Sequence, residues 1–275
     1  MKNILVINDY TPEAEYAAKI ALLIARHIQA DLLLANCHEY VGELMKRTVT
    51  STFYKDTGFD NYENDLQNKL YHTDQQPLTG YTPKITTIDL QDTSEAVLAG
   101  FAIRNQVEMI VMGVMPGAVN QTSKISGASL LKKINGPLLL VPYGWSIKEI
   151  RRLCYIAELR YCRLDVVRYL SRFATSWRAD ISIAHLCARE LPEMEARYAE
   201  KVFEQEIHHH VNYPRLLFTP VAECDARRAV DVFIHAMDMD MLVLVNQCFH
   251  FQDVLGGPTV DDFPAYLTVP LLVFP

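Results

Sequence analysis

Short apolar runs alternate with amphipathic segments along most of the chain. Residues 109–112 and 241–245 are entirely apolar, which is typical of parallel strands covered on both faces. Between the first two apolar runs of the chain, residues 4–7 and 32–35, apolar residues recur every three or four positions, as at Ala17, Ile20 and Ile24, and predict an amphipathic helix. Because alternating strands and helices favour right-handed crossovers, the pattern predicts a doubly wound α/β fold with a parallel sheet.

This pattern occurs twice. Four segments of the first half match segments of the second half in the same order. The matched pairs are 4–9 with 153–158 and 30–35 with 179–184 at an offset of 149, 108–112 with 240–244 at 132, and 137–142 with 270–275 at 133. We therefore predict two tandem copies of one doubly wound domain, residues 1–143 and residues 149–275.

The two copies differ most between their second and third strands. The fall in offset from 149 to 132 means that the second copy lacks 17 residues there. In the first copy this stretch, residues 40–83, is polar and contains one short helical candidate near residues 62–71. We interpret it as a variable surface excursion, with a lid over a binding site as the alternative.

Charge and composition narrow the function classes. Lys and Arg number 26 against 33 Asp and Glu, a net charge of −7 without a basic run, so nucleic acid is not an expected partner. No apolar stretch approaches the roughly 18 residues that span a bilayer, so we expect a cytoplasmic protein without a membrane partner. Six cysteines without a C-x-x-C pair predict reduced thiols rather than a disulfide framework or a metal site.

Candidate binding residues follow the predicted strands, because ligands of open parallel sheets bind beyond the carboxyl ends of the strands. Asp9 follows the first strand, Asn36 ends the second, and a loop at residues 113–129 follows the fourth. This loop is glycine-containing and opens a short helix. Glycine backbone and free N–H groups at a helix N-terminus are suited to holding a phosphate.

At these residues the chain resembles the universal stress protein family, in particular its tandem-domain branch. The resemblance covers essentially the full length and rests on Asp9, on the loop from Gly113 to Gly127, and on the final strand ending in Val141 and Pro142. It implies a five-stranded, adenine nucleotide alpha hydrolase-like domain of strand order 3-2-1-4-5 in each half, and a non-enzymatic stress-response function. It also implies an intramolecular pseudo-dimer of the two halves through their fifth strands, with a homodimer as a further option.

Nucleotide-binding members of that family carry a glycine, two residues, a glycine, nine residues, and a glycine followed by Ser or Thr. This chain has Gly113, three residues, Gly117, nine residues, Gly127 and then Ala128. One spacing is therefore a residue too long, and the hydroxyl is missing. The resemblance implies that Asp9 accepts a hydrogen bond from adenine while the three glycines approach ribose and phosphates.

Two serines complete the candidate site. Ser126 is a substitute for the missing hydroxyl, whereas Ser129 lies about 100° further around a helix than Ala128. Losing one hydrogen bond costs about 1 kcal/mol, so we expect weak binding of ATP or another adenine nucleotide in the first copy, without a metal. The alternative is a degenerate scaffold that binds no nucleotide and acts through another small ligand or a protein partner.

The second copy lacks the glycine loop and is expected to be structural. Residues 245–251 are mostly bulky, and Glu158 replaces Asp9. His185 and Cys187 end a strand and are interpreted as packed, although a metal or redox site with Cys248 or His250 is an alternative.

Other chemistry finds little support in the sequence. Residues 208–210 are three consecutive histidines, which cannot all converge on one ion from a helix, so we interpret them as a solvated helix end. P-loop, dinucleotide-binding and nucleophile-elbow motifs are absent. The chain is therefore expected not to be an enzyme, with weak ATP hydrolysis as the remaining alternative.

Overall fold

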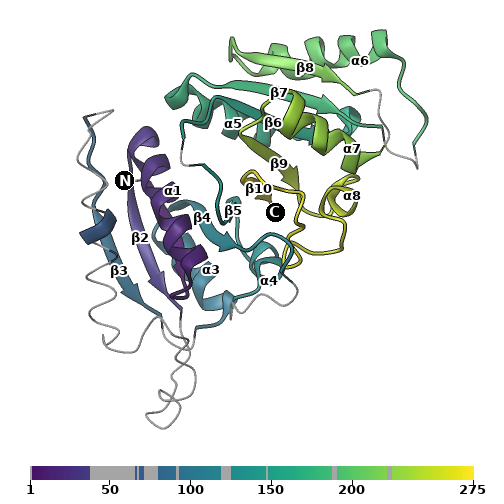
Figure 1. The fold of residues 1–275 in the computed structure, drawn as a ribbon. Helices are drawn as coiled ribbons and strands as arrows, with labels where there is room; N and C mark the ends of the chain where they lie inside the picture. Colours follow the sequence, from purple (N-terminus) through teal and green to yellow (C-terminus); the bar gives the residue numbers. More distant parts are fainter. Residues whose placement is uncertain are drawn as a thin grey trace.

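The computed structural model describes residues 2–37, 66, 68–70, 80–90, 93–118, 125–146, 148–187, 191–221 and 225–275. These residues form two α/β halves that share one ten-stranded sheet (Figure 1). The predicted tandem, doubly wound architecture is confirmed.

In the first half, the strands and helices alternate as the apolar pattern predicts. They are β1 (Lys2–Asn8), α1 (Pro12–Ile28), β2 (Ala30–Asn36), β3 (Ile85–Asp89), α3 (Glu95–Arg104), β4 (Val107–Val114), α4 (Gly127–Leu131) and β5 (Leu138–Pro142). Most of the predicted 40–83 excursion lies outside the described residues. Within its helical candidate, residues 66 and 68–70 are helical, and Leu66 and Leu70 are buried.

The second half repeats the order with more irregular helices. Its elements are β6 (Arg152–Ala157), η1 (Leu159–Tyr161), α5 (Leu164–Trp177), β7 (Asp180–His185), α6 (Ala196–Val202), η2 (Phe203–Ile207), η3 (His208–His210), β8 (Leu216–Pro220), α7 (Ala226–Asp231), η4 (Val232–Ala236), β9 (Met241–Val245), α8 (Phe251–Leu255) and β10 (Leu271–Phe274). The elements η2 and η4 are π-helical turns that continue α6 and α7. The three histidines of η3 are exposed, which confirms the solvated helix end.

Local sequence explains where α1 begins and ends. Thr11 caps the helix by accepting a hydrogen bond from the Ala14 N–H, and Pro12 occupies the first turn. The helix stops at Gln29, whose φ of 55° is left-handed. The predicted apolar stripe faces the sheet: Ala17, Ile20, Ala21 and Ile24 are buried, and Ile28 is partly buried.

The sheet runs β3-β2-β1-β4-β5-β10-β9-β6-β7-β8, so each half has the order third, second, first, fourth, fifth. All neighbours within a half are parallel, and β5 and β10 are antiparallel where the halves meet. There Leu140 faces Leu271, Leu139 faces Leu272, and both pairs are fully buried. The pairing removes one edge strand from each half and leaves β3 and β8 as the edges of the common sheet.

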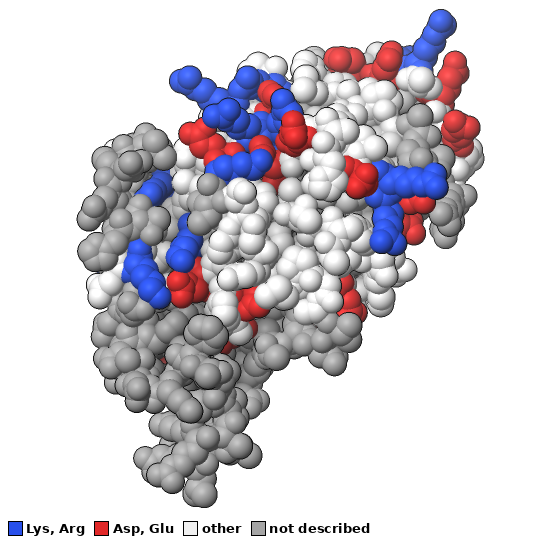
Figure 2. Space-filling view, viewed as in Figure 1, with Lys and Arg blue, Asp and Glu red and all other residues white. Residues whose placement is uncertain are grey.

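Charges on the surface are mixed in sign. On the face drawn in Figure 2, basic and acidic side chains lie next to one another near the upper edge, and a broad uncharged area occupies the middle of the view. None of the helices in the described residues is long and apolar enough to cross a lipid bilayer.

The cysteine prediction is correct for four residues and wrong for one. Cys37, Cys154, Cys162 and Cys248 are reduced thiols, whereas Cys187 is disulfide-bonded. Spacing along the chain carries no information about which loops meet in space, so this disulfide could not be read from the sequence.

The junction between the halves predicts a stability difference between two leucines. Replacing Leu139, which is fully buried, with alanine should lower the free energy of unfolding by about 2–5 kcal/mol. Leu217→Ala on the edge strand β8 is the control: its side chain is 49% exposed, so a change of about 0.5 kcal/mol or less is expected. Urea unfolding followed by circular dichroism measures both. Equal losses would contradict the role given to the junction.

Candidate functional site

The carboxyl ends of β1, β2 and β4 meet at one edge of the first half. Asn8, the last residue of β1, donates a 2.7 Å hydrogen bond from Nδ2 to Oδ1 of Asn36, and both side chains are buried. Asp9 follows but turns back on its own chain, because its Oδ1 accepts from Oγ of Thr11 at 2.6 Å and from the Thr11 N–H at 3.3 Å. Asn36 is therefore hydrogen-bonded to Asn8, and the Asp9 carboxylate is hydrogen-bonded to Thr11 at the start of α1.

Gly113 lies where α1 crosses the end of β4. A Cβ atom at this position would lie 2.2 Å from the carbonyl oxygen of Glu13, in the first turn of α1. Glycine is therefore needed for the helix to approach the strand. The space beside Gly113 is filled by the protein's own backbone.

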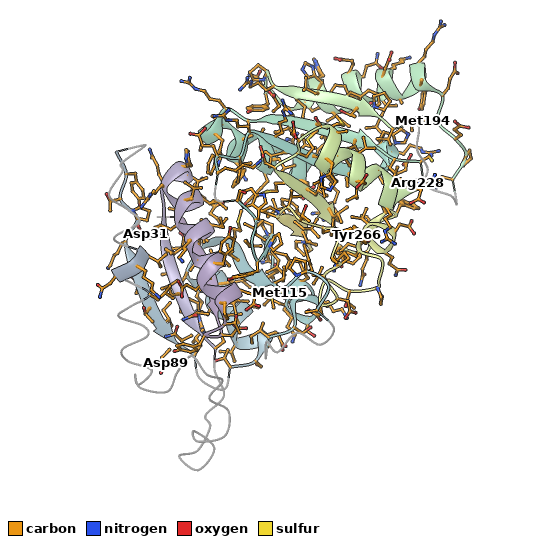
Figure 3. The ribbon with its side chains drawn as sticks, in the orientation of Figure 1. Asp31, Asp89, Met115, Met194, Arg228 and Tyr266 are labelled. Atoms are coloured by element: carbon orange, nitrogen blue, oxygen red, sulfur yellow. The ribbon has the colours of Figure 1, made fainter. Side chains whose placement is uncertain are left out.

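Gly117 contacts the second half. Its φ is 74°, and its N–H donates a 2.9 Å hydrogen bond to the carbonyl oxygen of Phe263. A Cβ atom here would lie 2.9 Å from the Cβ of Ala265. Figure 3 labels Met115, two residues before Gly117, and Tyr266, which follows Ala265 in the second half.

The start of α4 holds a carboxylate from the second half. Ser126 caps the helix by accepting from the Ser129 N–H at 3.1 Å, and its Oγ donates to Oδ2 of Asp261 at 2.6 Å. The other oxygen of Asp261 accepts from the Ala128 N–H at 3.2 Å. Gly127 is equally close to this segment, since a Cβ there would lie 3.0 Å from Cγ2 of Val260.

A second carboxylate holds the same helix start from the first half. The Ser126 N–H donates to Oε1 of Glu95 at 3.2 Å, and Lys133 lies 3.6 Å from the other oxygen. The pKa of Glu95 is lowered from its ordinary value, first by a hydrogen bond from its own backbone N–H and then by Ser126 and Lys133. Glu95 therefore supports the cap of α4 in its ionised form.

A phosphate bound to this loop would need free backbone N–H donors. The N–H groups of Gly117, Ala128 and Ser129 each already donate to an acceptor within the chain. The loop therefore offers a phosphate none of these three donors. Asp261 and Phe263 accept two of these hydrogen bonds and belong to the other half. The glycine spacing does not reveal either of them.

The equivalent edge of the second half contains a buried polar cluster. The Glu158 side chain is fully buried and accepts from Nε of Arg160 at 2.8 Å. Nδ1 of His185 accepts from the Leu159 N–H at 3.3 Å, and His250 is buried nearby with no hydrogen-bond partner for Nε2 in the described part of the chain. A cavity of about 20 Å³, enough for one water molecule, has Glu158 and His250 among its lining residues.

Burial disfavours the charged form of both histidines in this cluster. Burial lowers the pKa of both His185 and His250, while the Glu158 carboxylate partly opposes the shift. Among the residues that the structure describes, no three His, Cys, Asp or Glu side chains are grouped to hold a metal ion.

No protein-family model and no curated protein sequence matches the chain. Among solved structures, a universal stress protein from Archaeoglobus fulgidus matches with a TM-score of 0.62 at 10% identity, over 99% of this chain and 97% of that one. A putative universal stress protein from Pseudomonas aeruginosa matches with a TM-score of 0.53 at 15% identity, over 99% and 92%. The chain has the tandem universal stress protein fold. The cytoplasmic domain of a prokaryotic cation chloride cotransporter also matches, with a TM-score of 0.54 at 10% identity over 99% and 94%, so this fold occurs in different functional contexts.

The close approach at Gly113 predicts opposite effects of alanine at two glycines. Gly113→Ala should destabilise the protein by more than about 1 kcal/mol, because the new Cβ collides with backbone. Gly100→Ala in α3 is the control: its Cβ would meet nothing within 4 Å, so stability should rise by up to about 1 kcal/mol through helix propensity. Chemical unfolding measures both, and a tolerated Gly113→Ala would contradict the packing described.

The buried histidines of the second half predict loss of stability in acid. Their pKa values are lowered by folding, so the unfolded chain binds protons more readily as the pH falls below the ordinary value of about 6.5. The free energy of unfolding should be highest above about pH 6.5 and should decline below it. For each histidine, the decline reaches about 1.4 kcal/mol for every unit by which folding lowers its pKa. Unfolding free energies between pH 7.5 and pH 5 should show this decline weakened in His250→Gln and unchanged in the exposed control His209→Gln. An identical decline in both variants would contradict the assignment.

Proposed function

We propose that the chain is a non-enzymatic, cytoplasmic stress-response protein of the universal stress type whose first half works without a bound nucleotide. One observation carries the proposal: the Asp261 carboxylate is bonded to Ser126 and to the Ala128 N–H at the start of α4. The loop that the resemblance assigns to ribose and phosphates is thereby used to join the two halves. The protein then acts through another small ligand or a protein partner.

Weak binding of ATP in the first half is the second candidate. It is favoured by the same geometry, since donors that hold a carboxylate are oriented towards an anion. A nucleotide would have to displace Asp261 and to approach Gly113, where Glu13 fills the space. These costs make the nucleotide-free form the better supported of the two.

The two candidates differ in what the purified protein carries and how it responds to ATP. We expect mass spectrometry of the denatured protein to find no released nucleotide. We also expect millimolar ATP to leave the melting temperature unchanged, because a ligand that binds only the folded state would raise it. No phosphate should be released from ATP above the rate of a blank. Stoichiometric nucleotide in the preparation, or a saturable rise in melting temperature, would contradict the nucleotide-free proposal.

A further inference from the structure

We infer that the outward face of α3 is an interface through which two copies of this chain associate about a two-fold axis at Gly100. The inference goes beyond the proposed function, because it assigns a surface and a partner that do not depend on whether a nucleotide binds. The fifth strands, through which the resemblance implies pairing, are already used inside the chain, where β5 pairs with β10. A second copy therefore needs a different surface.

The outward face of α3 is apolar along most of its length. Val97 is 50% exposed and Ile103 is 54% exposed, and no charged residue lies between them in the sequence. Gly100 lies midway, and a Cβ atom there would meet nothing within 4 Å. Large apolar side chains exposed on successive turns form a contiguous patch, which is typical of an interaction surface rather than of scattered exposure.

The corresponding helix of the second half shows that the fold does not require an apolar outward face. At the offset of 132, α3 aligns with α7 and η4. Arg228 there takes the place of Ala96, His235 takes the place of Ile103, and both are exposed. Each lies 4.0 Å or less from an acidic side chain nearby in the chain. The apolar side chains of α3 are therefore particular to the first half.

The α3 face is complementary to its own two-fold image. Val97 and Ile103 each lie three residues from Gly100, one towards each end of the helix. On an ideal helix they project about 60° to either side of it. Two copies of α3 packed antiparallel with Gly100 at the axis bring Val97 of one copy level with Ile103 of the other, and the reverse contact forms as well. A two-fold dimer requires this kind of self-complementary surface.

The charges at the ends of α3 favour the same antiparallel arrangement. Glu95 lies in the first turn and Arg104 in the last. Glu95 contacts Ser126 and Lys133 but keeps 20% of its side chain exposed, and Arg104 is exposed without an ion pair to any residue that the structure describes. Antiparallel copies place the acidic end of each helix beside the basic end of the other. Parallel copies would place like charges together.

A groove beside Ile103 enlarges the apolar surface. Its volume is about 210 Å³, and Ala102, Ile103, Ile134 and Pro137 are among its lining residues. One helix face with this groove is small for a specific interface, which typically buries about 1,200–2,000 Å² in total. We therefore expect a reversible dimer of moderate affinity.

Analytical ultracentrifugation between about 1 μM and about 1 mM tests the dimer. Wild type should change from monomer to dimer over this range. Ile103→Asp and Val97→Asp each place a carboxylate against an apolar side chain of the other copy and should raise the dissociation constant at least about tenfold. Val232→Asp is the matched control, because this valine is 47% exposed in the second half, and it should leave the dimer unchanged. Circular dichroism and melting temperature establish the fold of each variant.

Cross-linking tests the position of the axis. Gly100→Cys places one thiol of each copy at the axis, where a disulfide forms only if the two Cα atoms lie within about 7 Å. The background is Cys248→Ser, because Cys248 is an exposed thiol. Under copper–phenanthroline oxidation, we expect a covalent dimer of Gly100→Cys to form at least about tenfold faster than a dimer of the control Val232→Cys in the same background.

Each outcome supports the α3 interface or overturns it. A wild-type chain that stays monomeric leaves the α3 face to a partner of other chemistry and overturns the inference. A dimer that folded Ile103→Asp and Val97→Asp do not weaken, or that Val232→Asp weakens equally, uses another surface and also overturns it. Equal cross-linking rates for the two cysteine variants contradict the axis at Gly100. These measurements contain no nucleotide, so their results are independent of the nucleotide-free proposal.

Discussion

The antiparallel pairing of β5 with β10 is the interaction on which the rest of the arrangement depends. Three consecutive residue pairs of buried leucine and valine join two parallel sheets into one. Without this pairing, each fifth strand would be an exposed apolar edge that could pair with another chain. The pairing therefore removes an aggregation-prone edge from both halves. It also fixes the two copies about an approximate two-fold relation, so that residues at equivalent positions near the junction come face to face.

That relation determines the state of the candidate site. The loop before β10 is carried against the loop before β5, and Asp261 and Phe263 meet the donors of Ala128 and Gly117. A single half in isolation would leave these donors without their present acceptors. The closure of the first-half loop is thus a property of the tandem chain rather than of the glycine sequence.

Sequence periodicity was sufficient for the fold and insufficient for the site. Apolar runs and stripes predict the alternation of strands and helices because burial on both faces of a parallel sheet demands them. The glycine spacing marks a loop as a candidate site, but it does not show which atoms of the protein lie beside each glycine. At Gly113 the neighbour is Glu13 of α1, and at Gly127 it is Val260, more than a hundred residues further along the chain. Neither contact has a local signature, and the disulfide at Cys187 has none either.

The acidic residue after the first strand is bonded to its own chain in both halves. In the first half, Asp9 accepts hydrogen bonds from Thr11 and so starts α1. In the second half, its counterpart Glu158 caps η1 by accepting from the N–H and the guanidinium of Arg160. Both carboxylates satisfy backbone donors that the following turn would otherwise leave unpaired. An acidic side chain at this position is therefore explained by chain geometry alone in both copies, and its presence is weak evidence for adenine recognition in either.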